Sequence, residues 1–129
     1  MEFQKEKTMQ LQIVELWEFT SLGEDYETPQ EEFRVQTGRI DLLARKKDGS
    51  ELLVIELKRS TASRDAVAQV QAYMNNVRKE VAQPHQEVRG MVIAAAKDAG
   101  FDSALQESQR GAGEVPTIVF RAYRMQFGV

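Results

Sequence analysis

The residues of this sequence that are best suited to chemistry are two carboxylates and an amine on segments joined by a short turn. Asp48-Gly49 has the composition of a two-residue hairpin turn, because these residues adopt the positive dihedral angles of a type I′ turn. Counting outward from this turn places Asp41 opposite Glu56. Two residues further out, the same register places Arg39 opposite Lys58. Opposed residues share a sheet face with β-carbons roughly 4.5–5.5 Å apart, so the register predicts one small charged cluster.

Two facing carboxylates are suited to a hard divalent cation, which relieves their mutual repulsion. Mg²⁺ prefers oxygen ligands, keeps several waters and commonly uses phosphate oxygens. Asp41 and Glu56 would be its side-chain ligands, and the carbonyl of Leu57 would be a further oxygen. Lys58 could orient or deprotonate a water beside the metal, or stabilise charge on the reacting phosphate. The cluster is therefore a candidate site for Mg²⁺-assisted chemistry at a phosphate.

The alternative is a solvated hairpin whose charges form ordinary cross-strand ion pairs. The position of the charged residues argues against this alternative. Glu56 and Lys58 follow the most apolar segment, Leu52 to Ile55, where unpaired charges are costly to bury. From spacing alone, both interpretations stay open.

The elements that must position this cluster follow from hydrophobic patterning. Alternating apolar residues predict strands, and apolar residues at helical spacing predict helices. We expect Gly38 to be a bulge or a point of close approach inside the second strand. The predicted strands are 9–19, 32–44, 51–58, 88–95 and 115–127, and the predicted helices are 60–82 and 97–109. The order β-β-β-α-β-α-β predicts an α/β fold in which helices flank a central mixed sheet.

Composition limits the possible functions. The 129 residues are expected to form one domain, 1–129, with residues 1–8 disordered. There is no cysteine and only one histidine, His85, which excludes thiol nucleophiles and makes a histidine-rich metal site unlikely. No apolar run is long enough for a membrane span, and we expect a cytoplasmic protein without membrane contact. The net charge is −3, yet residues 39–64 carry seven basic and four acidic residues, which suits either a DNA contact or a solvated hairpin.

The segments Gly38–Ala44 and Val54–Arg59 together resemble the signature of the PD-(D/E)XK nuclease superfamily, and most closely its NucS/EndoMS-like branch. The resemblance implies a restriction-endonuclease-like core that cuts DNA with Mg²⁺ or Mn²⁺, with a task in DNA repair. It assigns the metal-binding carboxylates to Asp41 and Glu56 and the catalytic lysine to Lys58.

The segment Gln69–Tyr73 resembles the Gln-x-x-x-Tyr motif of RecB-like nucleases. One helical turn separates Gln69 from Tyr73, so they share a helix face. The resemblance implies that Gln69 helps to order the active site or the DNA backbone, and that Tyr73 contacts DNA. Without the family, a polar pair at the edge of a core helix is an equal alternative.

Three arginines are candidates for contacts with DNA phosphates. Arg39 lies beside the cluster and could hold a phosphate bidentately, or pair with a local carboxylate. Arg59 and Arg64 flank the end of the catalytic strand and the start of the next helix, where a phosphate is expected.

The start of the chain departs from the family pattern. Relatives place a helix before the first strand, often with an additional acidic residue that faces the metal. Either residues 9–22 form that helix, with Glu15 or Glu18 as the acid, or the helix is missing. The alternation from Leu11 to Phe19 favours its absence, which would leave a sheet face for a second copy, as a homodimer, or for a partner domain to cover.

A second interpretation of function is a catalytically silent nuclease-fold module that binds DNA or a protein partner. The negative net charge and the expected loss of the front helix favour this alternative. The intact set of Asp41, Glu56 and Lys58 argues against it, because a silent module has no evident need for these residues.

Overall fold

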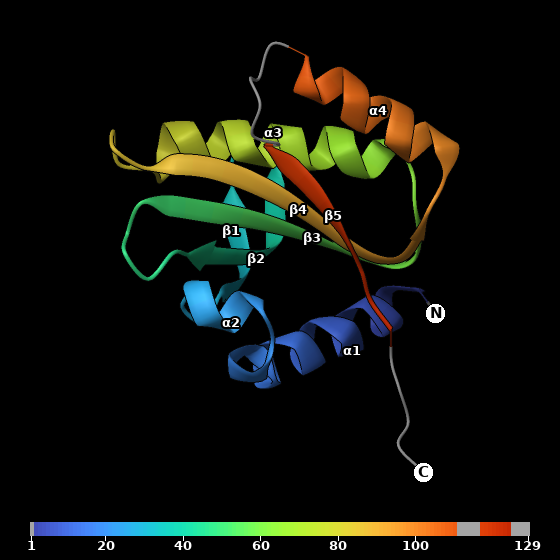
Figure 1. Ribbon diagram of the computed structural model, residues 1–129, viewed down its shortest axis with the longest axis horizontal. Coiled ribbons are helices and arrows are strands. Elements are labelled where there is room, and N and C mark those ends of the chain that lie inside the picture. Colours follow the sequence, from blue (N-terminus) through green and yellow to red (C-terminus); the bar gives the residue numbers. More distant parts are fainter. Residues whose placement is uncertain (1, 111–116, 125–129) are drawn as a thin grey trace.

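The chain folds around one five-stranded sheet with helices on both faces, as shown by a computed structural model that describes residues 2–110 and 117–124 (Figure 1). This confirms the predicted α/β class. The elements are α1 (Glu2–Glu15), the 3-10 turn η1 (Trp17–Phe19), α2 (Leu22–Asp25), β1 (Gln30–Val35), β2 (Gly38–Arg45), β3 (Glu51–Ala62), α3 (Arg64–Glu80), β4 (Glu87–Lys97), α4 (Ala99–Gln109) and β5 (Ile118–Ala122).

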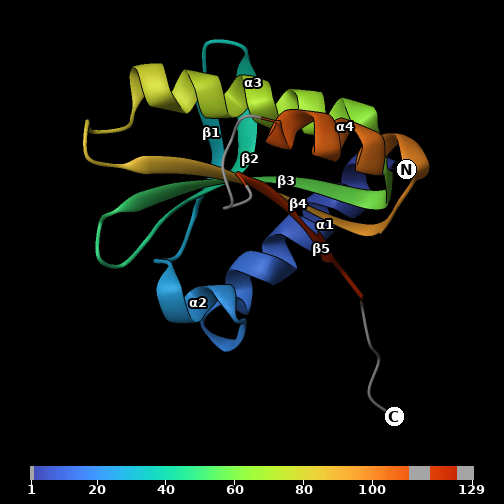
Figure 2. The same ribbon diagram turned by 45° about the horizontal axis from the view of Figure 1, so that its top comes forward.

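The sheet separates two hydrophobic layers, with α3 and α4 on one face and α1 and α2 on the other (Figures 1 and 2). Successive residues of β3 face opposite sides and are buried on both, as expected for a central strand between helices. The layer beneath α3 includes Val54, Val70, Val77, Val92 and Phe101. The layer beneath α1 includes Met9, Trp17, Leu42, Ile55 and Leu57.

The strands lie in the order β1-β2-β3-β4-β5, with antiparallel pairing among the first three strands and parallel pairing thereafter. Leu42 pairs with Ile55, which is the register predicted for the hairpin. The loop is longer than expected, because the Lys46 N–H donates to the Glu51 carbonyl at 2.9 Å and four residues lie between them. The strand register is still the predicted one, because the expected two-residue loop and the observed four-residue loop have the same centre, between Asp48 and Gly49.

The predicted strand at residues 9–19 is wrong. Residues 2–15 form the helix α1, which includes residues 2–8 that were expected to be disordered. The apolar residues that matter are Met9, Ile13 and Trp17, which recur at helical spacing and pack beneath the sheet. Leu11 is 52% exposed and Phe19 is 80% exposed, so the alternation between them is not a core pattern.

The front helix is therefore present, and it covers the sheet face that was expected to be open. The reason for expecting a second copy or a partner domain on that face no longer holds. Among the described helices, none is long and apolar enough to cross a membrane.

The predicted strand at residues 32–44 is two strands, β1 and β2, which reverse direction at Gln36 and Thr37. Gly38 starts β2 and is not a bulge. It is a point of close approach, because a β-carbon there would lie 3.0 Å from the hydroxyl of Tyr73. The number of strands matches the prediction only because two errors offset each other.

The later elements agree closely with the sequence patterns. The strand β3 runs to Ala62, so α3 begins at Arg64 rather than at residue 60. The helix α4 starts after Asp98, whose carboxylate accepts the Phe101 N–H at 2.8 Å. Of the predicted last strand, the described part forms β5, and residues 115–116 and 125–127 lie outside the described residues.

Candidate active site

The candidate site lies where β2 and β3 separate. Their backbone pairing extends from Arg45 and Leu52 to Leu42 and Ile55. Hydrogen-bonded pairs alternate along an antiparallel ladder, so the next such bond of the Leu57 N–H would go to Ile40. The Leu57 N–H instead donates to Oδ2 of Asp41 at 2.8 Å. The Asp41 side chain therefore takes the place of a backbone acceptor at this fork.

Glu56 lies across from Asp41 and is almost completely buried, with 4% of its surface exposed. Its Oε2 atom has no hydrogen-bond partner among the described residues. Burial is the largest cause that raises the pKa of Glu56, followed by the Asp41 carboxyl group, with a smaller contribution from Glu6, whereas the charge of Lys58 lowers this pKa. A buried polar atom without a partner is rare and costly, and calls for an explanation.

A divalent cation fits this donor set. Asp41 lines a cavity of about 100 Å³ together with Glu6, so carboxylate oxygens are available there, and Leu57 is a further lining residue. Glu56 does not line this cavity itself but lies next to Asp41. Within the described chain, no three Asp, Glu or His side chains gather closely enough to hold a metal by themselves. Mg²⁺ suits such a site, because it is usually held by one or two carboxylates and completes its shell with water and phosphate oxygens.

The structure brings most of the predicted catalytic set together. Lys58 is half-buried on β3, two residues after Glu56, and its charge acts on that carboxyl group. Arg39 is exposed and lines the same cavity as Asp41.

Gln69 and Tyr73 lie together on α3, but Tyr73 is not placed for the DNA contact that was expected of it. The Gln69 amide donates to the Tyr73 hydroxyl at 3.0 Å, and Tyr73 is only 6% exposed. The Tyr73 ring packs against Gly38, three residues before Asp41. This pair therefore supports the start of β2 from α3, and little of Tyr73 remains accessible to DNA.

The remaining predicted arginines lie apart from the cavity lining. The Arg59 guanidinium lies 5.9 Å from the centre of the Tyr123 ring. Arg64 lines a separate hollow between α3 and α4. The structure gives neither residue a contact with Asp41 or Glu56.

Glu6 is one of the residues near the site that sequence reasoning missed. It lies on α1, lines the cavity with Asp41, and its charge contributes to the raised pKa of Glu56. Glu15 and Glu18, the acids expected on a front helix, are exposed and outside that lining. The helical spacing of Met9 and the residues after it was the signal that would have identified Glu6.

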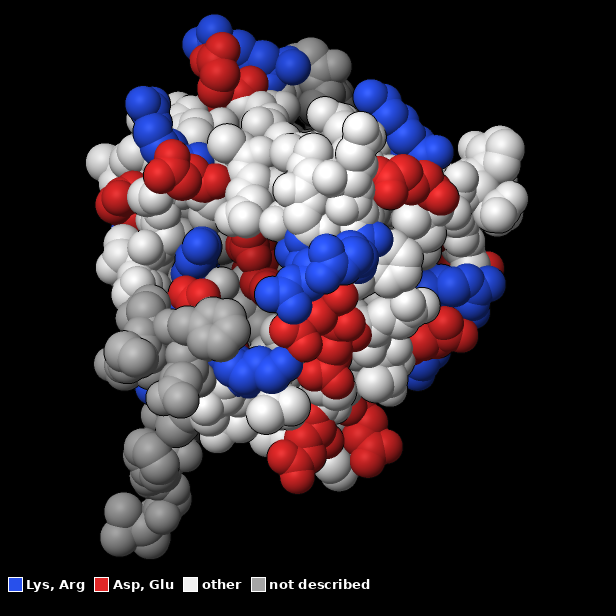
Figure 3. Space-filling model, turned by 180° about the vertical axis from the view of Figure 1, so that it is seen from behind, with Lys and Arg blue, Asp and Glu red and all other residues white. Residues whose placement is uncertain are grey.

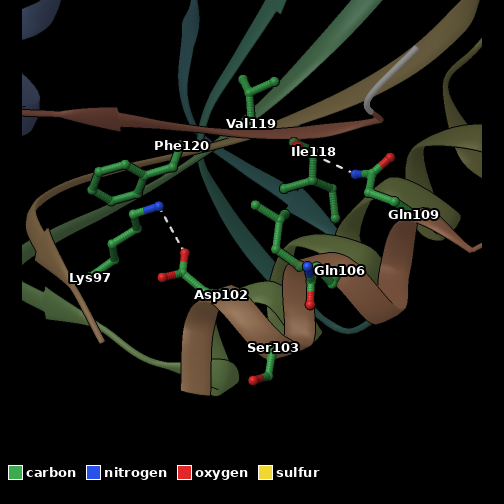
Figure 4. Close-up of a pocket in the computed structure, with 9 residues that line it drawn as sticks. Lys97, Asp102, Ser103, Gln106, Gln109, Ile118, Val119 and Phe120 are labelled. Atoms are coloured by element: carbon green, nitrogen blue, oxygen red, sulfur yellow. Dashed lines mark hydrogen bonds and ion pairs between the residues drawn. The ribbon is translucent and has the colours of Figure 1, made fainter. Parts of the chain in front are cut away.

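The candidate site is not distinguished by the volume of its cavity. A larger cavity of about 600 Å³ lies between α4 and β5, where Lys97 pairs with Asp102 at 2.8 Å beside Phe120 (Figure 4). It contains no pair of neighbouring carboxylates of the kind found at the fork.

The face of the molecule in view in Figure 3 does not carry a broad field of one sign. In Figure 3, basic and acidic side chains alternate across the face that is in view. Electrostatic attraction of a nucleic acid would therefore depend on local groups of cations rather than on the net charge of −3.

Known proteins resemble this chain in structure and in sequence. A repair endonuclease from Pyrococcus abyssi superposes with a TM-score of 0.68 and 26% identity over 89% of this chain and 45% of its own. A structure of EndoMS with double-stranded DNA superposes with a TM-score of 0.70 and 26% identity over 92% of this chain and 44% of its own.

In sequence, the endonuclease NucS of Thermococcus kodakarensis is 34% identical over 73 residues, which are 57% of this chain and 27% of that protein. The chain thus spans less than half of the length of these relatives. Residues 5–110 match the family described as the endonuclease NucS C-terminal domain, and the chain therefore belongs to this family.

Proposed function

We propose that this domain is the catalytic core of a DNA endonuclease that requires Mg²⁺ or Mn²⁺. The observation that carries the proposal is the buried, unsatisfied Glu56 oxygen beside Asp41, with Lys58 two residues away. Such a pair of carboxylates destabilises a protein unless a cation or a proton neutralises it.

Asp41 and Glu56 would hold the cation through their carboxylates, and Leu57 through its carbonyl. When bound, a divalent cation polarises the scissile phosphate and lowers the pKa of a coordinated water. Lys58 would position the attacking water or stabilise the negative charge that develops on the phosphate oxygens. Gln69 would act indirectly, since it orients Tyr73 against the strand that carries Asp41.

Similarity to EndoMS, whose structure was solved with double-stranded DNA, supports DNA as the substrate. Similarity to a repair endonuclease supports a task in DNA repair. In this proposal Arg39 contacts the phosphate at the cavity, whereas Arg59 and Arg64 contact the backbone further along the strand. The proposal leaves Tyr73 in a supporting role, because its ring is buried.

The second candidate is a catalytically silent module that binds DNA or a protein. The net charge of −3 and the mixed charges of the surface favour it. The expected loss of the front helix no longer favours this candidate, because α1 is present and contributes Glu6 to the cavity.

The test is cleavage of labelled single-stranded, duplex, mismatched, flapped and four-way-junction DNA in Mn²⁺. We expect cleavage by the wild type and none by Glu56→Gln or Lys58→Ala. Glu18→Gln is the matched control, because Glu18 is exposed and lies away from the cavity. Binding of DNA without cleavage by any form would favour the silent module.

A further inference from the structure

Glu32 has an unusual backbone conformation in the middle of β1. Its φ is 52°, and it is the one non-glycine residue with a positive φ in the described part of the chain. Such a conformation is strained for a residue with a side chain and persists only where the surroundings impose it. Strain of this kind is often found at functional sites, so the surroundings of Glu32 are informative.

Glu32 lies opposite Asp41 in the sheet. The neighbouring pairs are Glu31 with Leu42 and Phe33 with Ile40, which leaves Glu32 and Asp41 facing each other between them. Residues two apart on a strand normally share a face. Leu42 nevertheless packs in the layer beneath α1, and Ile40 packs in the layer beneath α3. The normal alternation of side chains along β2 is therefore interrupted at Asp41. The positive φ of Glu32 lies at the matching position of the adjacent strand, β1.

The Glu32 carboxylate holds two cations from two other elements. Lys7 of α1 places its Nζ 2.7 Å from Oε2, and Arg39 of β2 places its Nη1 3.6 Å from Oε1. All three side chains line the cavity that also contains Asp41. They remain accessible to solvent, with 37% to 51% of each side chain exposed.

The charges of this group are unequal. Two cations share the Glu32 carboxylate, which leaves this three-residue cluster with an excess of one positive charge. The carboxylates of Asp41 and Glu6 line the same cavity and would repel DNA phosphates, and the two cations beside them offset this repulsion. Elsewhere, Arg45 and Glu27 form a pair of one cation with one anion, which has no such excess.

We propose that Glu32 is a positioning residue that holds Lys7 and Arg39 as a two-cation clamp for a DNA backbone phosphate beside the scissile one. The inference rests on the proposed function, because it takes DNA as the ligand. Arg39 and Lys7 contact the phosphate, and Glu32 acts through them. The strained backbone conformation of Glu32 directs its carboxylate toward both cations.

The test is the affinity for duplex DNA in EDTA, where no metal-dependent cleavage occurs, measured over a range of salt concentrations. Lys7→Ala and Arg39→Ala should each weaken binding and lower the salt slope by about 1. Glu32→Gln should also weaken binding, by about fivefold, because Lys7 and Arg39 would no longer be held in place for the phosphate. The loss of one phosphate contact should lower the salt slope by roughly 1. Electrostatics alone predicts the opposite sign, since this variant removes a negative charge.

Two further variants separate positioning from folding and from general charge. Glu32→Gly permits the positive φ without strain, so it should fold at least as stably as the wild type and still bind DNA more weakly. Glu27→Gln removes the matched ion pair and should bind as tightly as the wild type or tighter.

Unchanged or tighter binding by both Glu32 variants would overturn the clamp, while wild-type cleavage of DNA would leave the proposed function intact. A wild type that neither binds nor cleaves DNA would overturn both.

Discussion

Two glutamates on the same strand have opposite environments. Glu51 begins β3 and Glu56 lies in its middle, and each is 4% exposed. Glu51 accepts a hydrogen bond from the Tyr26 hydroxyl and an ion pair from Arg89, whose Nε lies 3.1 Å away. Glu56 faces a second carboxylate and has an oxygen without a partner among the described residues.

The difference separates a carboxylate with a structural role from the one that we propose to be functional. Burial and the Glu51 carboxylate raise the pKa of Tyr26, so this phenol remains a donor at neutral pH. Glu51 therefore joins the segment after α2 to the sheet. Among the described residues, Oε2 of Glu56 has no hydrogen-bond partner. A costly buried acid next to a carboxylate that lines a cavity is a better candidate for chemistry than a satisfied one.

The largest expected effect is on catalysis. Glu56→Gln should reduce the rate of DNA cleavage by roughly 1000-fold, because it removes a metal-binding charge where electrostatic stabilisation acts. Glu51→Gln should keep the wild-type rate per folded molecule, since Glu51 lies at the other end of β3. Single-turnover cleavage in Mn²⁺ measures both. Equal losses in the two variants would remove the distinction between the glutamates.

The next effect is on folding, where Glu51 should matter more. Glu51→Gln should lower the free energy of unfolding by about 2 kcal/mol, because Tyr26 and Arg89 lose a charged acceptor in a buried position. Urea denaturation measures this value, with Glu27→Gln as a control whose ion pair is exposed. If the loss does not exceed that of the control, Glu51 does not have the structural role described above.

Glu56→Gln should have the opposite sign in metal-free buffer and raise the free energy of unfolding by about 1 kcal/mol, since a neutral side chain relieves an unsatisfied buried acid. Addition of Mn²⁺ should raise the Tm of the wild type, because a ligand that binds only the folded state stabilises it. The Tm of the variant should respond weakly. Thermal melts with and without Mn²⁺ check both statements, and an equal response of the two proteins would exclude Glu56 as a ligand.

The last effect is a dependence of stability on pH in metal-free buffer. The pKa of Glu56 is raised by folding, so the folded state binds more protons than the unfolded state. This stabilising contribution is complete below the ordinary pKa near 4.5 and is lost as the pH rises toward the higher folded value. Denaturation curves between pH 5 and 9 should show wild-type stability falling relative to Glu56→Gln. A constant difference across that range would contradict the raised pKa.

The hairpin that carries the proposed catalytic residues could be predicted from sequence because its determinants are local. The Asp48-Gly49 turn and the apolar residues that flank it fix the pairing of Leu42 with Ile55. Asp41 and Glu56 follow from that register, and only the length of the loop was misjudged.

The N-terminal helix could not be predicted in the same way. Its residues suit an alternating pattern through Leu11 and a helical one through Met9 and Ile13, and short apolar segments do not distinguish the two. The sheet decides between them, because Met9 is fully buried beneath it and Leu11 is not. The cluster at Glu32 was missed for a related reason, since its three side chains come from distant segments that meet only in the folded protein.

The last described residues also contact the first helix. The Tyr123 hydroxyl donates to the Gln12 side chain at 2.6 Å, across 111 positions of the sequence. Contacts between such distant residues require closure of a long loop, which is entropically costly and slow. We therefore expect α1 to dock late in folding and to open by local unfolding before the central strands do. The cavity that α1 completes would then be the last part of the domain to assemble, and amide hydrogen exchange in α1 would be faster than in β3.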